Sequence, residues 1–216
     1  MKKLPKIINQ EEFEKIFIAE NNKEAKLAML LGFEAGMRIS EIVGLKSYES
    51  KCCKVGIIEK KIKEGDKNFK RLFCLKCERQ LKFSEMRRSR DLWDISPLKK
   101  ENIDLQGHSI KIIAGKGEKD RIVPLPSRFN EKAYNLLPIK ISRRALQQKI
   151  NNLGKRVLNR EISFHTLRHG FCTHLATMGR PLHEIQMLAG HSRLDTTGIY
   201  LHANPKHAIE GARDAF

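Results

Sequence analysis

The sequence has no apolar stretch long enough to cross a membrane, and its first residues do not form a secretory signal. The N-terminus, MKKLPKIINQEEF, is basic but lacks the apolar region that such a signal requires. The five cysteines are an odd number, and their spacing is not that of a secreted disulfide framework. We therefore expect a cytoplasmic protein without a membrane partner.

Acidic residues are scarce beside basic ones. The chain has 42 Lys and Arg against 25 Asp and Glu, which gives a formal net charge of +17. Solubility needs far less charge, so the excess indicates a polyanionic partner, either nucleic acid or an acidic membrane surface. Nucleic acid is the favoured interpretation.

The hydrophobic pattern predicts an α+β fold that is mostly α-helical and has one small sheet. Hydrophobic residues make up 40% of the chain, which is enough for one sizeable core. Apolar residues at helical spacing predict a helix from Gln10 to Leu31 and a second through RISEIVGL. Between Leu98 and Pro126 the period changes, and NIDL, SIKII and RIVPLP predict a three-stranded antiparallel sheet with a GKGEKD turn.

Capping residues predict three more helices toward the C-terminus. Ser142 can cap a helix through ALQQKINNLGKRVL, and Ser163 can cap one through HTLRHGFCTHLATM. Pro181 suits the start of the last helix, and Gly190 suits its end. The next residue, a histidine, then lies at a helix exit.

Six polar residues that are scattered along the chain suit an attack on a phosphodiester. The pentacoordinate phosphorus that forms gains negative charge, which arginine and histidine donors can stabilise. A tyrosine can act as the nucleophile when cations and a base assist it, and a lysine can protonate the departing hydroxyl. The candidates are Arg38, Lys116, His165, Arg168, His191 and Tyr200. His165 and Arg168 are neighbours on one helical face, whereas a bend must follow His191 if Tyr200 is to act with it.

Four motifs carry a resemblance to a known family. In chain order they are EAGMRISEIVGL, GKGEKDRIVPLP, HTLRHGFCTHL and LAGHSRLDTTGIY. Together they resemble the catalytic domain of the tyrosine recombinase (phage integrase) family, near its Xer-like members. The resemblance implies a catalytic domain at residues 1–45 and 98–216. It also implies a site-specific DNA recombinase that needs no cofactor for catalysis and acts on double-stranded DNA as a homo-oligomer, a tetramer on DNA.

The resemblance also implies a role for each candidate. Tyr200 would form a 3′-phosphotyrosyl bond, Arg38 and Arg168 would clamp the scissile phosphate, and His165 and His191 would hydrogen-bond it and assist proton transfer. Lys116 would protonate the 5′-hydroxyl, with Lys119 and Arg121 as rivals for that role. Glu41 would orient Arg38 rather than react. The outcome could be integration, excision, inversion or dimer resolution.

Two alternatives to a recombinase remain open at this point. One is DNA relaxation of the type IB topoisomerase kind, which needs a single protomer and any DNA. The other is a DNA-binding regulator that no longer catalyses a reaction.

The sequence departs from the family pattern in two places. The family usually has a separate N-terminal helical domain that clamps DNA, and here the catalytic motifs begin at once. We therefore expect that core-binding domain to be absent from this chain, either because the chain is a fragment or because it resembles compact members such as the fimbrial-type invertases. The second departure is an insertion at residues 46–97, where the family has a direct connection.

The insertion is basic and contains four of the five cysteines. Cys74 and Cys77 form a C-x-x-C pair, as in a zinc knuckle, and the adjacent Cys52 and Cys53 could complete a set of four thiolates. Paired C-x-x-C motifs are more usual, so free thiols or a redox-labile pair are equally consistent with the spacing. A metal here would be structural, because the tyrosine chemistry does not use one.

Overall fold

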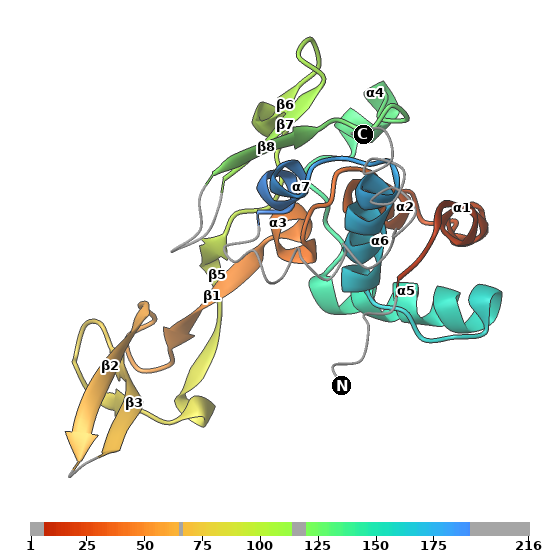
Figure 1. Cartoon of the computed structure of the whole chain (residues 1–216). Coiled ribbons are helices and arrows are strands. Elements are labelled where there is room, and N and C mark those ends of the chain that lie inside the picture. Colours follow the sequence, from red (N-terminus) through yellow and green to blue (C-terminus); the bar gives the residue numbers. More distant parts are fainter. Residues whose placement is uncertain (1–6, 65–66, 114–119, 191–216) are drawn as a thin grey trace. The chain divides into compact units, whose positions relative to one another are not determined.

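The computed structural model describes residues 7–64, 67–113 and 120–190. The chain forms two compact units, one from the segments on either side of the insertion and one from Leu45–Ser96. The first is called the catalytic unit below, and the second the inserted unit. Figure 1 shows the elements of both, coloured along the chain.

The N-terminal segment of the catalytic unit forms two helices, α1 (Gln10–Ala19) and α2 (Lys23–Glu34). The prediction of one helix from Gln10 to Leu31 was therefore wrong. The break has a local cause, because the Glu20 carboxylate accepts hydrogen bonds from the backbone N–H groups of Asn21 and Asn22. The Asn22 side chain then caps α2 by accepting from Ala25 N.

One short helix precedes the insertion, and a second short helix and a sheet come after it. Helix α3 (Ile39–Val43) ends at the insertion, and the chain returns through η2 (Lys100–Asn102). The predicted antiparallel sheet is present, in the order β6 (Ile103–Asp104), β7 (Ser109–Ile112) and β8 (Arg121–Pro124). Ile110 and Val123 pair across β7 and β8, and both side chains are buried.

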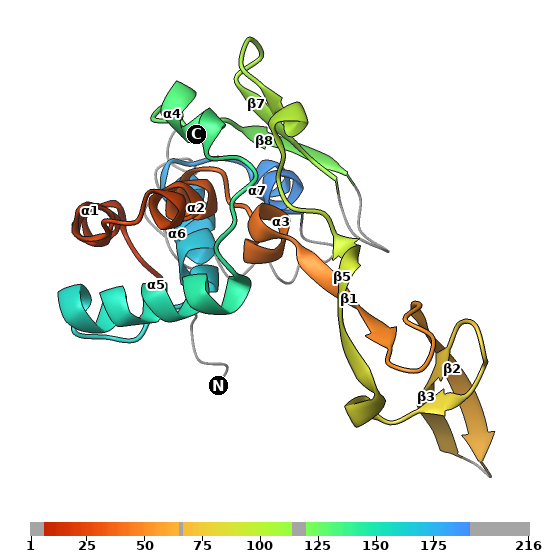
Figure 2. The same cartoon turned by 180° about the vertical axis from the view of Figure 1, so that it is seen from behind.

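The C-terminal helices of the described chain begin and end near the predicted capping residues. A short α4 (Glu131–Asn135) precedes α5 (Arg143–Leu158), which Ser142 caps, and α6 (Phe164–Thr177), which Ser163 caps. Helix α7 (Leu182–Ala189) follows Pro181 and ends at Gly190. Figure 1 shows α6 beside α2 and α7 beside β8, and Figure 2 shows α5 running past α1 and α6 from the other side.

The core of the catalytic unit lies between α1, α2, α5, α6 and the sheet. Phe13 of α1 stacks on Phe33 of α2 with ring centroids 4.0 Å apart. The backbone at Gly32 lies so close to the Phe164 ring that an added Cβ would stand 2.7 Å from it. This close packing of α2 against α6 fixes the distance between the loop after α2 and the middle of α6, on which the site below depends.

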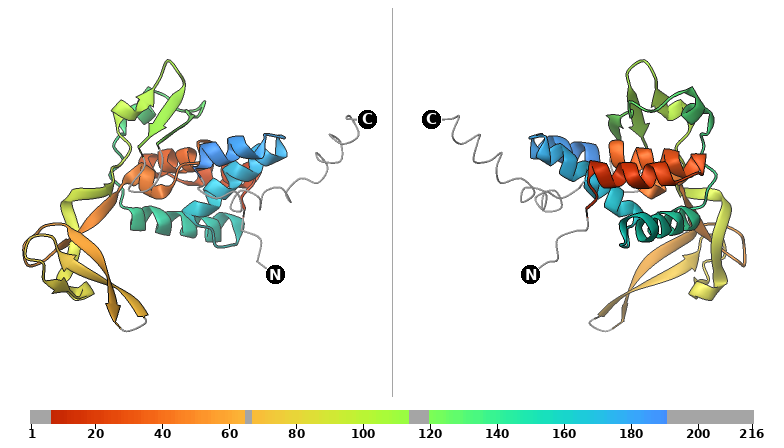
Figure 3. Two further views of the ribbon diagram at one scale, coloured as in Figure 1. Left: turned by 60° about the vertical axis from the view of Figure 1, so that its left-hand side comes forward. Right: turned by 90° about the vertical axis from the view of Figure 1, so that its right-hand side faces the viewer.

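The inserted unit is built from short antiparallel strands. A ribbon pairs β1 (Leu45–Ser50) with β5 (Met86–Ile95), and a sheet joins β2 (Ile57–Glu64), β3 (Lys67–Cys74) and β4 (Gln80–Leu81). A 3-10 turn, η1 (Phe83–Glu85), precedes β5. These strands, orange to yellow-green in Figure 3, were not predicted, because their charged residues hide the alternation that reveals a half-buried strand.

None of the helices in the described part of the chain combines the length and the apolar character needed to span a membrane.

Candidate active site

Three arginines from three separate elements converge on the C-terminal end of α7. Arg121 Nε donates to the carbonyl of Leu188 at 2.9 Å, and Arg38 Nη2 donates to that of Gly190 at 2.9 Å. Arg168 Nη2 donates to the carbonyl between them, that of Ala189. The last carbonyls of a helix have no partner within the helix and carry partial negative charge, so cations are stabilised there.

Gly190 makes this arrangement possible because it ends α7 in the left-handed conformation, with φ of 62°. A side chain at this position would be strained, and its Cβ would lie 3.0 Å from Arg121 Cδ. The glycine therefore turns the chain out of the helix while its own carbonyl remains available to Arg38. The next residue is His191, so the three guanidinium groups lie at the point where the predicted catalytic segment begins.

Arg168 lies deepest among the three arginines, with a residue exposure of 2%. Its second terminal nitrogen, Nη1, donates to the carbonyl of Gly36, in the loop after α2. Burial and the positive charge of Arg38 lower the pKa of Arg168 to about 10. The guanidinium therefore still carries its charge at neutral pH.

Arg38 precedes α3, and the carboxylate of Glu41, in the first turn of that helix, contacts Arg38. The Glu41 carboxylate accepts from Arg38 N at 2.7 Å and from Arg38 Nη1 at 3.1 Å. The same carboxylate accepts from both terminal nitrogens of Arg121, at 2.8 and 2.9 Å. Each carboxylate oxygen thus receives two donors, which is its full capacity.

Glu41 is ionised despite its burial. Desolvation by itself would raise the pKa of this carboxyl. The hydrogen bonds and charge of Arg121, the backbone hydrogen bond from Arg38 and the charge of Arg168 outweigh it and lower the pKa. Three guanidinium groups and one carboxylate leave a net charge of two positive. A pentacoordinate phosphorus formed from a phosphodiester carries two negative charges, so the charge of the cluster is equal in size and opposite in sign.

His165 lies on α6, one turn before Arg168, and is exposed. Partial desolvation of the ring and the charges of Arg168 and Arg38 lower the pKa of His165. Its ring meets that of His169 edge to face, with centroids 4.2 Å apart. Burial and His165 lower the pKa of His169 to about 4, so this second imidazole is neutral near pH 7.

The structure thus brings together three of the six candidates, Arg38, His165 and Arg168. The other three, Lys116, His191 and Tyr200, lie outside the described residues, as does Lys119.

Sequence reasoning missed the structural part that Arg121 plays. The alternation in β8 contained the signal, because Arg121 shares its buried face with Val123. A cation on the inward face of a strand requires a buried acidic partner, which here is Glu41.

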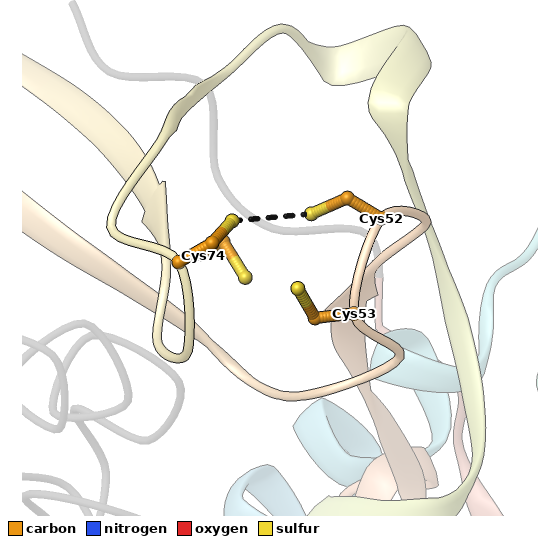
Figure 4. Close-up of side chains that lie close together, drawn as sticks. Cys52, Cys53 and Cys74 are labelled. Atoms are coloured by element: carbon orange, nitrogen blue, oxygen red, sulfur yellow. Dashed lines mark hydrogen bonds between the residues drawn. The ribbon is translucent and has the colours of Figure 1, made fainter.

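The inserted unit contains a second cluster of reactive groups. The sulfur atoms of four cysteines all lie within 4.8 Å of one another, and none of the four forms a disulfide. Figure 4 shows the side chains of Cys52 and Cys53 directed toward that of Cys74 from a separate loop. Among the described residues, the cluster that could supply a set of metal ligands consists of Cys52, Cys53, Cys74 and Cys77.

Comparison with known proteins gives matches to one family. Residues 84–207 match the Phage integrase family, a range that begins after Arg38 and includes Tyr200. The tyrosine recombinase XerC of Thermodesulfovibrio yellowstonii is 36% identical over 142 residues, covering 54% of this chain and 47% of the relative. The tyrosine recombinase XerA of Pyrococcus horikoshii is 28% identical over 234 residues, covering 99% and 62%.

A solved structure shows the same fold. The site-specific recombinase XerH, bound to palindromic difH substrate in a post-cleavage complex, superposes with a TM-score of 0.59 at 21% identity, covering 97% of this chain and 53% of that one. The chain thus spans about half the length of XerC and somewhat more of XerA. The family match covers more than half of the sequence, and the predicted likeness to Xer proteins is confirmed. This chain belongs to the phage integrase, or tyrosine recombinase, family.

Proposed function

We propose that this chain is a site-specific DNA recombinase that cleaves and rejoins DNA through a 3′-phosphotyrosyl intermediate. The observation that carries the proposal is the convergence of Arg38 and Arg168 on successive carbonyls at the end of α7, where His191 follows in the sequence. A guanidinium has five N–H donors in a fork that suits phosphate oxygens, so two such groups on successive carbonyls favour a phosphate site.

In the proposed reaction, the phenolic oxygen of Tyr200 attacks the scissile phosphorus. The phosphorus–5′-oxygen bond breaks, its electron pair goes to that oxygen, and Lys116 supplies the proton. The phenolic proton passes to one of the two histidines, His165 or His191. Arg38 and Arg168 stabilise the two negative charges of the pentacoordinate phosphorus. A second 5′-hydroxyl then attacks the phosphotyrosyl bond and reseals the DNA, so the sequence of steps conserves the phosphodiester energy.

Lys116 is a better general acid than its rival Arg121. All three kinds of guanidinium nitrogen of Arg121 already donate to Leu188 or Glu41, and its side chain is buried. An arginine also retains its proton far above neutral pH, whereas an acid catalyst must release one.

The proposed partner is double-stranded DNA, in agreement with the net charge of +17. The related recombinase XerH is known in complex with its difH substrate. We place the protein in the cytoplasm, acting as a homo-oligomer with four protomers on two duplexes. Catalysis uses no cofactor, and a metal on the four cysteines would serve only the fold of the inserted unit.

A suicide DNA duplex, nicked so that the cleaved fragment diffuses away, tests the proposal. The wild-type chain should form a covalent adduct that survives denaturation, and Tyr200→Phe should form none while still binding DNA. Tyr134→Phe is the matched control and should form the adduct normally. Binding without an adduct in every variant would instead support a regulator, and relaxation of supercoiled DNA of any sequence would support a topoisomerase.

A further inference from the structure

Two turns in the inserted unit have the same backbone structure. In the first, Ser50 N donates to Val55 O at 2.9 Å, and Lys54 N donates to Ser50 O at 2.9 Å. In the second, Cys74 N donates to Arg79 O at 3.0 Å, and Glu78 N donates to Cys74 O at 2.9 Å. The fifth residue of each turn has a positive φ, 56° at Lys54 and 53° at Glu78. The two turns are therefore structural equivalents.

This equivalence explains the irregular cysteine spacing. The second turn, C-L-K-C, has thiols at its first and fourth positions, Cys74 and Cys77. The first turn, S-K-C-C, has a thiol at its fourth position, Cys53, but a serine at its first position, Ser50. The neighbouring Cys52 supplies the missing sulfur. Vicinal cysteines thus stand where a second C-x-x-C would otherwise be expected, and all four sulfur atoms still reach one another.

The spacing of the sulfur atoms fits a tetrahedral metal ion. Zinc–sulfur bonds of about 2.3 Å at tetrahedral angles place sulfur atoms about 3.8 Å apart. The sulfur atoms of Cys52 and Cys77 are 3.7 Å apart, and all four lie within 4.8 Å of one another. A disulfide would require a separation of about 2.05 Å, so these separations exclude an oxidised pair and are compatible with a metal centre.

Neighbouring residues suit a charged centre of this kind. The hydroxyl of Ser50, which is buried, lies 3.2 Å from the sulfur of Cys74 and can donate to a thiolate. Four thiolates around a divalent ion leave two negative charges, which basic side chains of the two turns would balance. Cys52 and Cys77 are exposed, which gives an ion a path of entry. The basic residues are Lys51, Lys54, Lys76 and Arg79.

The part of the inserted unit that the structure describes has only a small buried core. Its buried apolar cluster consists of Cys74, Leu81 and Met86, with a few partly buried neighbours. A core of this size rarely stabilises a segment of about 50 residues, and natural domains of that length often depend on a metal. Cys74 belongs both to this small core and to the thiol cluster.

We propose that Cys52, Cys53, Cys74 and Cys77 bind one structural zinc ion, which joins the two equivalent turns and stabilises the inserted unit. This site is separate from the recombination chemistry, no step of which uses a metal. Its failure or success therefore leaves the proposed function unaffected.

Metal content and spectroscopy of the full chain test the proposal. Protein purified without chelator should contain one zinc per chain, and replacement by Co²⁺ should give the intense visible bands of a tetrahedral thiolate site. Cys77→Ser should reduce zinc to well below one per chain. Cys172→Ala, which removes the one cysteine outside the inserted unit, should retain the full zinc content.

The equivalence of the two turns allows a rescue experiment. Cys52→Ser should lose zinc, and the double variant Ser50→Cys with Cys52→Ser should regain one zinc per chain, because it restores C-x-x-C in both turns. Both variants keep the same chain length and charge, so a general loss of folding cannot explain recovery in the second.

Three results would overturn the proposal. One is protein supplied with zinc that contains none while all four thiols remain titratable. Another is a Co²⁺ spectrum without sulfur ligation. The third is a wild-type chain, purified in air without chelator, in which Cys52 and Cys77 form a disulfide in place of bound metal.

Discussion

Glu41 of α3 and Arg121 of β8 form a two-fold hydrogen-bonded ion pair across a sequence separation of 80 residues, with distances of 2.8 and 2.9 Å. Their side chains are 3% and 6% exposed. The pair joins the sheet to the helix that follows Arg38, and Arg121 continues the connection to α7 through the Leu188 carbonyl. The position of the proposed catalytic arginines therefore depends on a carboxylate to which the proposed mechanism assigns no step.

Glu41→Gln should destabilise the catalytic unit by about 3 kcal/mol or more, because it leaves buried guanidinium charges without their counter-charge. Urea unfolding at neutral pH measures the loss. Glu11→Gln is the control, because its pairing with Lys15 is exposed and should leave the urea midpoint nearly unchanged. An equal, small effect of the two changes would show that the buried pair does not organise the site.

The same residue predicts a dependence on acid. The folded-state pKa of Glu41 lies below the ordinary value of 4.5, so its stabilising contribution is complete above that value. The contribution is lost as the pH falls from 4.5 through the folded pKa. Urea midpoints measured across that window should fall more steeply in the wild type than in Glu41→Gln, and parallel curves would contradict the prediction.

The identity of the general acid can be tested with a substrate in which sulfur replaces the scissile 5′ oxygen, because a thiolate leaves without a proton. Lys116→Ala should slow cleavage of the oxygen substrate by about 10²- to 10⁴-fold. The same variant should cleave the sulfur substrate at the wild-type rate. Arg168→Lys should stay slow on both, since it acts on the non-bridging oxygens. If the sulfur substrate instead restored cleavage by Arg121→Ala, Arg121 would be identified as the acid.

Gly190→Ala should lower both stability and cleavage. A left-handed backbone costs an alanine about 1–2 kcal/mol, and here the new Cβ also presses on Arg121. Gly179→Ala is the matched control, because Gly179 has φ of 72° but is exposed. Thermal unfolding should show a loss in both variants, whereas only Gly190→Ala should impair adduct formation. Normal cleavage by Gly190→Ala would show that the arginines tolerate movement of this turn.

The His165–His169 pair predicts a titration measurable by NMR. His169 should titrate near pH 4, and His165→Gln should raise that value by removing a neighbouring positive charge. It should stay below 6.5, because burial remains. Stability should fall as the pH drops from 6.5 toward 4, since only the unfolded chain then binds the proton. A His169 that titrates near 6.5 in the wild type would show that the ring is more solvated than the structure indicates.

Sequence by itself determined the elements whose signals are local. The caps at Ser142, Ser163 and Gly190 depend on residues a few positions away, and each appears in the structure where the pattern placed it. The motifs likewise identified the family, because their residue types and order are properties of the chain. The failure at α1 was local too, since the Glu20 side chain took the N–H groups that a continuous helix would have used.

Only the tertiary structure decided which of these residues meet. Arg38, Arg121 and Arg168 donate to successive carbonyls at the end of α7, over separations that no helical or strand period spans. The equivalence of the turns at Ser50 and Cys74 is also invisible in the sequence, because hydrogen bonds rather than matching residues define it. Packing brings such groups together through long-range contacts, and a local pattern contains no information about a contact whose partner lies elsewhere in the chain.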